Sequence, residues 1–369
     1  MELAIHDFLA GQVHADRGCR IVEFGADDGL ARTWLRLEKA ASLPTQSYAF
    51  AWALSRSLLA DARLEVLVVA GERGSGALLP LCRERSYFAP WRAMGAREVF
   101  EPMDVLGSDP GSLDLLAGAI ARQPRALQLD RIPVASPLVP ALRKAMRGRG
   151  WLSVRPALPC PKITLGQGWT DPESCFNARR RSDFRRAARR ASERGSVSYE
   201  VLSPEPDHFD ACFDEAIGVE LNSWKREAGT AIAVHRGKEK FFREFFRSAA
   251  ERGELRIAFL RIDGHAVAMQ MALESLGSYW LFKIGYDEEF GKCSPGTLLM
   301  LHTLAWAAGR RLRSFELLGN AEPWIAELWT QENVACVQLR CYPFGIRGAA
   351  AFAKDALAWA LRRLMRPAA

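Results

Sequence analysis

Residues 279–310, YWLFKIGYDEEFGKCSPGTLLMLHTLAWAAGR, contain a strand, a loop and a helix start in immediate succession. The alternating and aromatic residues up to Tyr286 are typical of a buried strand. After the loop, Ser294 is a favoured N-cap, Pro295 stands where its missing N–H costs nothing, and Gly296 leaves the first backbone N–H groups open to a ligand. Because unpaired N–H groups and the positive end of the helix dipole attract anions, this stretch predicts either a phosphate site or an ordinary well-capped helix.

Outside this stretch, short β-rich runs alternate with longer helical runs, which is the pattern of an α/β or α+β fold with mixed sheets. The expected strands are residues 19–24, 64–70, 77–82, 127–132, 162–165, 197–202, 255–262, 266–273, 279–286, 314–318 and 335–342. The expected helices of the first half are residues 29–40, 48–59, 113–121 and 137–149, and further helices are expected between the strands of the second half.

The two halves of the chain resemble each other. The strand–turn–strand pattern of residues 64–82 returns at 255–273, and Asp130, Pro137 and Leu142 are followed by Glu316, Pro323 and Leu328 at a constant offset. A tandem duplication explains these echoes, although two unrelated α/β domains would also share hairpins followed by helices. We expect the joint at residues 156–161, where three prolines in six residues cannot continue a helix or a central strand.

Composition indicates a folded chain of two domains. The 369 residues are 49% hydrophobic, which is enough for a large core. The eight cysteines include no C-x-x-C pair and the six histidines are dispersed, so neither a disulfide framework nor a metal site is expected. The first residues lack the pattern of a signal peptide, and no apolar run approaches the roughly 18 residues of a membrane span. We therefore expect a soluble, cytoplasmic protein.

The excess positive charge is local. The formal net charge is +7, and residues 178–194 hold eight arginines against Asp183 and Glu193. Such a stretch can bind phosphates or carboxylates, including those of tRNA, an acidic polysaccharide or a carrier protein, or it can be a solvated helix face. Nucleic acid is the less favoured partner.

A resemblance to a known family rests on several motifs. They are ELNSWK at 220–225 with Gly229, DGHAVA at 263–268, FKIGYD at 282–287, SPGTLL at 294–299, FELLG at 315–319, AEPW at 321–324, and Trp329. In order and spacing, residues 170–345 resemble the GNAT-type acyltransferase domain of the CelD/BcsL family. These bacterial proteins are associated with cellulose and exopolysaccharide biosynthesis and are related to the tandem-GNAT Fem aminoacyltransferases. PTQSY at 44–48, LLPL at 78–81 and MDVL at 103–106 fit the first half of the same family.

The resemblance implies two tandem GNAT-like domains with mixed central sheets. Residues 1–160 would be a degenerate N-terminal domain, and residues 161–369 the acyltransferase domain with a C-terminal amphipathic helix. Two neighbouring parallel strands would splay apart to hold the acyl donor, and they map onto residues 266–273 and 279–286.

For the donor, an acyl-CoA such as acetyl-CoA, the resemblance implies binding by Gln270, Ser294, Pro295, Gly296 and Thr297. The loop GKCSPG at 291–296 departs from the usual Q/R-x-x-G-x-G/A phosphate loop, which leaves the donor open between a CoA thioester, a carrier-protein thioester and an acyl group on tRNA. No metal is implied.

Three residues are candidates for catalysis. Glu316 lies among apolar neighbours in SFELLG, so desolvation should raise its pKa toward that of a useful base. Glu322 follows on the next loop and is slightly preferred as base or acceptor clamp, and Tyr286 could protonate the leaving thiolate. The alternatives are an outward-facing strand carboxylate for Glu316 and an ordinary acid at a helix start for Glu322.

Candidates for acceptor binding are Glu220, Trp224, Lys225, Lys283 and Trp324. The first three share a predicted helix, where they could equally form a surface cluster. Lys283 interrupts an apolar strand, and a buried lysine needs a partner, for which Glu316 on an adjacent strand is suited.

The favoured function is an N- or O-acyltransferase that moves an acyl group from a CoA-type thioester to an amine or hydroxyl of a sugar or cell-envelope precursor. The alternatives are a Fem-like aminoacyltransferase that uses aminoacyl-tRNA and a non-catalytic subunit of a polysaccharide synthase. The last segment, residues 348–365, is amphipathic, which fits either a peripheral membrane contact or a helix docked on its own domain, the second being preferred.

Overall fold

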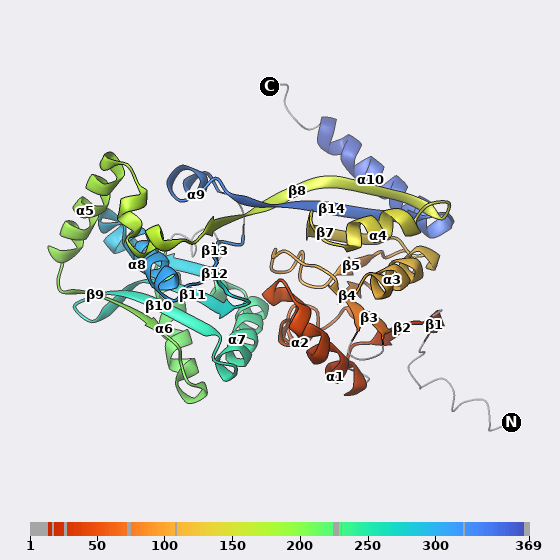
Figure 1. Ribbon diagram of the computed structural model, residues 1–369, viewed down its shortest axis with the longest axis horizontal. Helices are drawn as coiled ribbons and strands as arrows, with labels where there is room; N and C mark the ends of the chain where they lie inside the picture. The colour runs from red at the N-terminus through yellow and green to blue at the C-terminus, as the bar shows by residue number, and fades with distance from the viewer. Residues whose placement is uncertain are drawn as a thin grey trace. The chain divides into compact units, whose positions relative to one another are not determined.

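The computed structural model describes residues 14–16, 18–25, 28–71, 75–107, 109–223, 229, 231–319 and 322–364. The chain forms two compact units, whose elements are labelled in Figure 1. The first unit is Met1–Pro159 together with Ala335–Ala369, and the second is Cys160–Val334. Residues 335–369, which we expected in the second domain, therefore belong to the first unit. Their sequence pattern predicts a strand and a helix correctly but does not specify the sheet that the strand joins.

The first unit is a mixed sheet with helices. Its strands follow the order β1 (His14–Asp16), β2 (Cys19–Glu23), β3 (Arg63–Ala70), β4 (Gly76–Arg83), β5 (Trp91–Ala93), β7 (Leu127–Pro133), β14 (Asn333–Pro343) and β8 (Gly150–Thr164). The short strand β6 (Leu106–Gly107) pairs with β4. Its helices are α1 (Asp28–Leu37), α2 (Tyr48–Arg56), α3 (Pro110–Arg122), α4 (Leu138–Ala145) and α10 (Ile346–Leu364).

The second unit is also a mixed sheet with helices. From the end of β8 its strands follow the order β13 (Ser314–Glu316), β12 (Ser278–Tyr286), β11 (His265–Ser275), β10 (Leu255–Ile262) and β9 (Val197–Leu202). Its helices are α5 (Ala178–Ser192), α6 (Phe209–Leu221), α7 (Arg236–Glu251), α8 (Pro295–Gly309) and α9 (Pro323–Leu328).

Apart from the short β6, both halves of the chain run through the same order of helices and strands. The first series is β2, α1, α2, β3, β4, β5, α3, β7, α4 and β8. It corresponds, element by element, to β9, α6, α7, β10, β11, β12, α8, β13, α9 and β14. In each unit the central hairpin is antiparallel, and the strand after it is parallel to the strand that follows the next helix. This order supports the duplication hypothesis, and the expected mixed α/β fold is confirmed.

β8 runs through Pro156, Pro159 and Pro161, and the boundary between the two units, after Pro159, lies in the stretch where we expected the joint. In the first unit β8 is the last strand of the sheet. An edge strand tolerates residues that lack an N–H, whereas a central strand does not. Pro156 and Pro159 thus lie on a strand at the edge of the first unit's sheet, and Pro161 lies in the second unit, just before the residues of β8 that pair with β13.

Helices cover both faces of the second unit's sheet. Alternate residues of β10, among them Ala258 and Leu260, pack in one cluster with buried residues of α5 and α8. On the other face Phe282 of β12 packs against Phe245 and Phe246 of α7.

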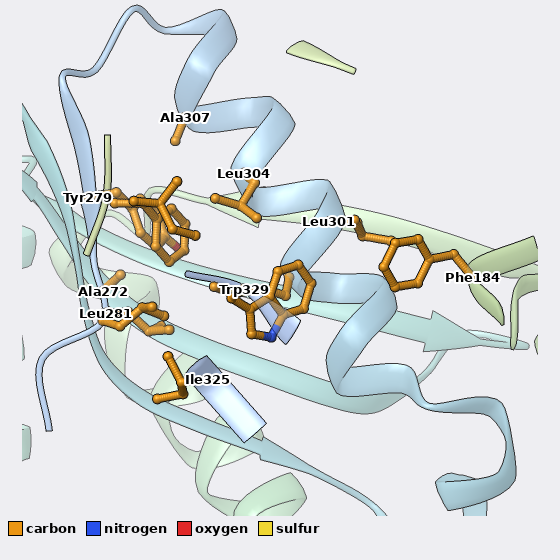
Figure 2. Packing of buried hydrophobic residues seen from close by; sticks show 13 residues of the cluster. Phe184, Ala272, Tyr279, Leu281, Leu301, Leu304, Ala307, Ile325 and Trp329 are labelled. Atoms are coloured by element: carbon orange, nitrogen blue, oxygen red, sulfur yellow. The ribbon is translucent and has the colours of Figure 1, made fainter. Parts of the chain in front are cut away.

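The main core of this unit lies between α8 and the sheet (Figure 2). Tyr279 of β12 and Phe315 of β13 are fully buried and stack with their ring centroids 4.5 Å apart. Leu301 and Leu304 of α8 and Trp329 after α9 belong to the same cluster. The neighbouring strands β12 and β13 are thus held to one helix by side chains on one face of the sheet.

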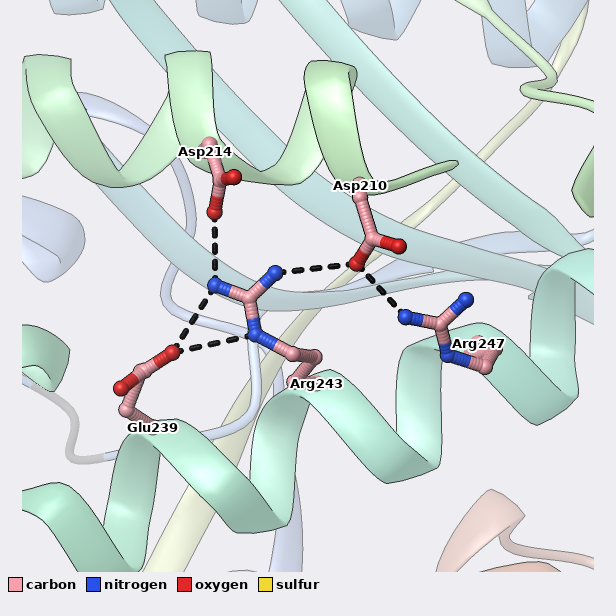
Figure 3. A network of polar contacts seen from close by, with 5 residues as sticks. All are labelled: Asp210, Asp214, Glu239, Arg243 and Arg247. Atoms are coloured by element: carbon pink, nitrogen blue, oxygen red, sulfur yellow. Dashed lines mark hydrogen bonds and ion pairs between the residues drawn. The ribbon is translucent and has the colours of Figure 1, made fainter. Parts of the chain in front are cut away.

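An ion-pair network joins α6 to α7 at the surface (Figure 3). Arg243 of α7 bonds Asp210 and Asp214 of α6, at 3.0 and 2.6 Å, as well as Glu239 on its own helix, and Arg247 shares Asp210. The Asp210 and Asp214 side chains are more than half exposed, so we assign this network a modest role in positioning the two helices. In the described part of the chain, no helix is long and apolar enough to cross a bilayer.

The packing of α8 can be tested with one substitution. Leu304 is fully buried in the core of Figure 2, so Leu304→Ala should lower the free energy of unfolding by about 2 to 5 kcal/mol through the cavity it leaves. Leu35 is 57% exposed on α1, and Leu35→Ala should change it by less than about 0.5 kcal/mol. Chemical unfolding followed by fluorescence measures both, and equal effects would contradict this core.

Candidate active site

β12 and β13 are parallel neighbours that stay paired for only three residues, ending at Trp280 opposite Glu316. Beyond this point the N–H of Leu317 donates to the carbonyl of Pro161 on β8, at 3.0 Å. β12 itself continues to Tyr286. In the described residues, the last part of β12 therefore has a backbone edge that no strand pairs with on the β13 side.

This arrangement corrects the predicted pair of splayed strands. Residues 266–273 and 279–286 are the two arms of an antiparallel hairpin, paired from Ala268 opposite Tyr286 to Ser275 opposite Ser278. They therefore do not part. The parallel strands that do part are β12 and β13, which are separated in sequence by α8.

Two local features mark the place where the strands part. Leu318 and Gly319, directly after β13, both have a φ of +50°. A left-handed conformation is strained for leucine, so the surrounding fold must hold this turn. On β12 the pairing with β11 shifts register, which leaves Phe282 without an opposite residue. Such a bulge bends the strand locally.

The N-terminus of α8 lies at the other end of this part of β12. Ser294 is in the left-handed region with a φ of +47°, and its carbonyl, rather than its side chain, accepts from the N–H groups of Thr297 and Leu298. Pro295 has no N–H. The N–H of Gly296 has no hydrogen-bond acceptor among the described residues. A Cβ placed on Gly296 would lie 3.4 Å from the ring of Tyr286, so this tyrosine borders the helix start.

Glu316 lies in a buried polar chain. The Ser314 hydroxyl donates to the Glu316 carboxylate at 2.6 Å, and the Ser314 and Ser278 hydroxyls lie 2.9 Å apart. Burial raises the pKa of Glu316 above its usual value, although the Ser314 hydrogen bond and the positive charge of Lys162 lower it. The carboxylate is therefore in the environment expected for a base.

The prediction that Lys283 pairs with Glu316 is wrong. Lys162 on β8 lies directly opposite Glu316, and it is the cation that acts on this carboxylate. Lys283 lies beyond the last pair of β12 and β13, and its ammonium group is 4.4 Å from the centroid of the Phe242 ring on α7. The adjacency of the two strands was correct, but Lys283 is three residues past the position opposite Glu316.

Glu322 and Trp324 lie together at the surface. Glu322 is exposed at the start of α9, and its carboxylate accepts from the indole N–H of Trp324 at 2.8 Å. Trp324 is 41% exposed. These two predicted residues thus form an exposed pair, whereas Glu316 is buried.

Glu220 and Gln270 are buried inside the second unit. The Glu220 carboxylate accepts from the N–H of Ile232 at 2.8 Å, and a Cβ on Gly285 would lie 3.1 Å from the Glu220 Cα, so α6 packs closely on β12 here. The Gln270 amide contacts the Met300 sulfur and the Tyr279 hydroxyl. Both positions fit a packing role. Trp224 and Lys225 lie outside the described residues.

The predicted residues therefore fall into separate groups. Tyr286 and residues 294–297 gather at the start of α8, and Glu316 lies where β12 and β13 part. The sequence reasoning missed Ser278, Ser314 and Lys162, which surround Glu316. The alternation of each strand could have placed Ser314 on the same face as Glu316, but Lys162 depends on a strand pairing that is distant in sequence. The described residues hold no cluster of three His, Cys, Asp or Glu side chains suited to a metal.

Comparison with known proteins gives the family of this segment. Residues 178–324 match the model of the acetyltransferase (GNAT) domain. No curated protein matches the chain. Among solved structures, FemX is similar with a TM-score of 0.54 at 10% identity, over 87% of this chain and 96% of that one.

Two further structures are similar at low identity. A conserved protein of unknown function from Bacteroides thetaiotaomicron has a TM-score of 0.53 at 10% identity, over 84% of this chain and 95% of its own. The C-terminal domain (DUF2156) of a proposed lysylphosphatidylglycerol synthetase from Agrobacterium fabrum has a TM-score of 0.50 at 15% identity, over 88% of this chain and 96% of its own. At these identities the likeness concerns the fold alone.

The matched segment runs from α5 to the start of α9 and so contains the parted strands, Glu316 and the start of α8. The prediction of a GNAT-type acyltransferase is confirmed by the match of residues 178–324 to the acetyltransferase (GNAT) domain model.

Proposed function

We propose that the second unit transfers an acyl group from a CoA-type thioester to an amine or hydroxyl of a saccharide or cell-envelope precursor. The observation that carries this proposal is that β12 continues from Trp280 to Tyr286 with no described strand beside it on the β13 side, and that it leads to the start of α8, where the N–H of Gly296 has no acceptor among the described residues. An extended amide-containing arm can pair with such an edge, and a pyrophosphate is stabilised at a helix N-terminus. The saccharide class rests on the resemblance to the CelD/BcsL family.

The distances along β12 fit a long donor. Trp280, where the strands part, and Tyr286, beside the start of α8, are six residues apart, or about 20 Å at the rise of a strand. A donor with its phosphates at α8 would thus present its thioester near Glu316. Tyr286 would line the phosphate end, so we do not assign it the protonation of the thiolate.

Glu316 is our candidate for the base. In the proposed step, the acceptor nitrogen or oxygen bonds to the thioester carbonyl carbon and its proton passes to the Glu316 carboxylate. The carbon–sulfur bond then breaks, and the thiolate takes up a proton from water. Burial favours Glu316 over the exposed Glu322, because a raised pKa brings a carboxylate closer to the operating pH of a base.

In the first unit, the helix start that corresponds to the start of α8 is already occupied by an acidic side chain. This supports one donor site per chain. Asp109 caps α3, the counterpart of α8, and its carboxylate accepts from the N–H groups of Ser112 and Gly76. These hydrogen bonds lower the pKa of Asp109, so a negative charge already occupies this helix start. A donor phosphate would be repelled there.

In the described residues, the first unit has no open strand edge of this kind beside β5. β5, the counterpart of β12, has only three residues, and beyond it the chain at Met103 and Leu106 bonds to both β7 and β4. Thr45 and Gln46 hold this segment by donating to the carbonyls of Pro102 and Val105, at 2.6 and 2.7 Å. The segment thus fills the space that an extended donor arm would need.

A second candidate function is an aminoacyltransferase that uses tRNA, and α5 is the observation that favours it. Arg185, Arg186, Arg189 and Arg190 are exposed on this helix. The Arg190 guanidinium donates to the carbonyl of Lys292, two residues before Ser294. A basic helix therefore borders the start of α8, where a phosphate-rich donor would be attracted. A subunit without activity would bind a donor but transfer nothing.

The donor can be tested by its effect on stability. CoA should raise the melting temperature in proportion to the logarithm of its concentration, because only the folded state binds it. Gly296→Glu should abolish this shift, since its carboxylate would occupy the place of a phosphate. Gly218→Glu adds the same group on α6, where a Cβ meets open space, and should keep the shift. A shift with tRNA alone would favour the aminoacyltransferase.

The base can be tested by comparing two glutamates. Glu316→Gln should lower kcat roughly 100-fold to 10,000-fold, the usual contribution of a positioned base. The wild-type rate should rise with pH through the raised pKa of Glu316, and the variant should lose this rise. Glu322→Gln should change kcat less than about threefold, because its amide can still accept from Trp324. The opposite ranking would return the role to Glu322, and no transfer by wild type with any donor would favour the inactive subunit.

A further inference from the structure

The C-terminal helix α10 exposes an apolar face. Ile346, Leu357 and Leu361 follow the helical spacing i, i+11 and i+15 and are 79, 62 and 50% exposed. Phe352 and Trp359, further round the helix, are 41 and 49% exposed. The exposed residues between these rows are alanines at positions 349, 353 and 356. We call this surface the α10 face.

Aromatic residues of the first unit extend the α10 face. Trp151 on β8 is 58% exposed, and its ring centroid lies 5.0 Å from that of Phe352. Near the start of the helix, Tyr87 is 62% exposed, and the guanidinium of Arg347 lies 3.6 Å from the centroid of its ring. Phe88 is half exposed beside Tyr87. Large exposed apolar side chains gathered on and beside one helix are typical of an interaction site.

The charges around the α10 face are positive. Up to Leu361, the helix contains Arg347 and Lys354 against a single acid, Asp355. Asp355 is turned inward, where it accepts from the Tyr342 hydroxyl at 2.8 Å and lies 3.4 Å from the Gln128 amide. Lys354 is exposed at the border of the face. An approaching surface therefore meets apolar and aromatic groups bordered by cations.

We propose that the α10 face binds the surface of a membrane that contains anionic lipids. Exposed isoleucine and leucine, flanked on one border by phenylalanine and tryptophan and on the other by lysine, are the composition of a helix that lies in the lipid–water interface. A second copy of the chain fits the charges less well, since a two-fold contact through the same patch brings equal cations together. The helix would lie on the membrane and not cross it, since no helix among the described residues is long and apolar enough to span a bilayer. This proposal does not depend on the identity of the acyl donor.

Vesicle sedimentation tests the proposal with the full chain. We expect it to sediment with vesicles of phosphatidylcholine containing 30% phosphatidylglycerol, roughly the anionic share that attracts basic helices, and to bind pure phosphatidylcholine at least about tenfold more weakly. Leu357→Glu should reduce binding to the anionic vesicles about tenfold or more. Leu35→Glu is the matched control, because Leu35 is 57% exposed on a helix outside the α10 face, and it should bind like wild type. Added salt should weaken wild-type binding.

Three results would overturn the proposal. One is the absence of wild-type binding to anionic vesicles, and another is an equal loss in Leu357→Glu and Leu35→Glu. The third is a wild-type dimer in sedimentation velocity that Leu357→Glu converts to a monomer while vesicle binding is absent, which would assign the α10 face to a second copy. Unchanged circular dichroism and melting temperature of Leu357→Glu would show that its loss of binding is not a loss of folding.

Discussion

The three-residue pairing of β12 with β13 is the constraint on which the second unit depends. Stacking of Tyr279 on Phe315 and the cover of α8 hold the strands together at this point. Directly after it, Leu317 bonds to β8 and the left-handed turn at Leu318 and Gly319 leads the chain away. If β13 paired with β12 over more residues, its backbone would form hydrogen bonds with the N–H and C=O groups along this edge of β12. β12 therefore continues without β13 beside it because the core fixes the two strands together at one end only.

The two units show how the same topology can carry different chemistry. Asp130 and Glu316 occupy equivalent positions, and each faces a basic residue on a neighbouring strand. Asp130 accepts from Gln338 at 2.6 Å and from Arg340 at 3.1 Å, which satisfies its charge with two donors. Glu316 accepts from one serine hydroxyl and is less compensated, so burial raises its pKa. A carboxylate that is left partly unsatisfied is the one able to take a proton.

Much of the fold could be predicted from the sequence, because strand and helix patterns are local. The expected strands at 197–202 and 255–262 match β9 and β10 residue for residue. The pairing of the strands was harder to predict, since it depends on contacts between segments that are distant in sequence. Nothing near residue 335 indicates that β14 joins the first unit, and nothing near Lys283 shows that Lys162 is the cation opposite Glu316. The start of α8 could be predicted because Ser294, Pro295 and Gly296 favour a helix start through their own backbone conformations, without help from distant residues.

The choice between Glu316 and Glu322 illustrates why burial matters more than location on a loop. The sequence places both near the end of the same strand, and a loop position favours Glu322 because loops often carry catalytic groups. In the structure Glu322 is exposed to water, which stabilises its charge, and it already accepts from Trp324. Glu316 is enclosed by Ser314, Trp280 and the apolar core, where its charge is costly. A group whose charge is costly gains most by accepting a proton, so the buried carboxylate is the better base although the loop residue is easier to reach.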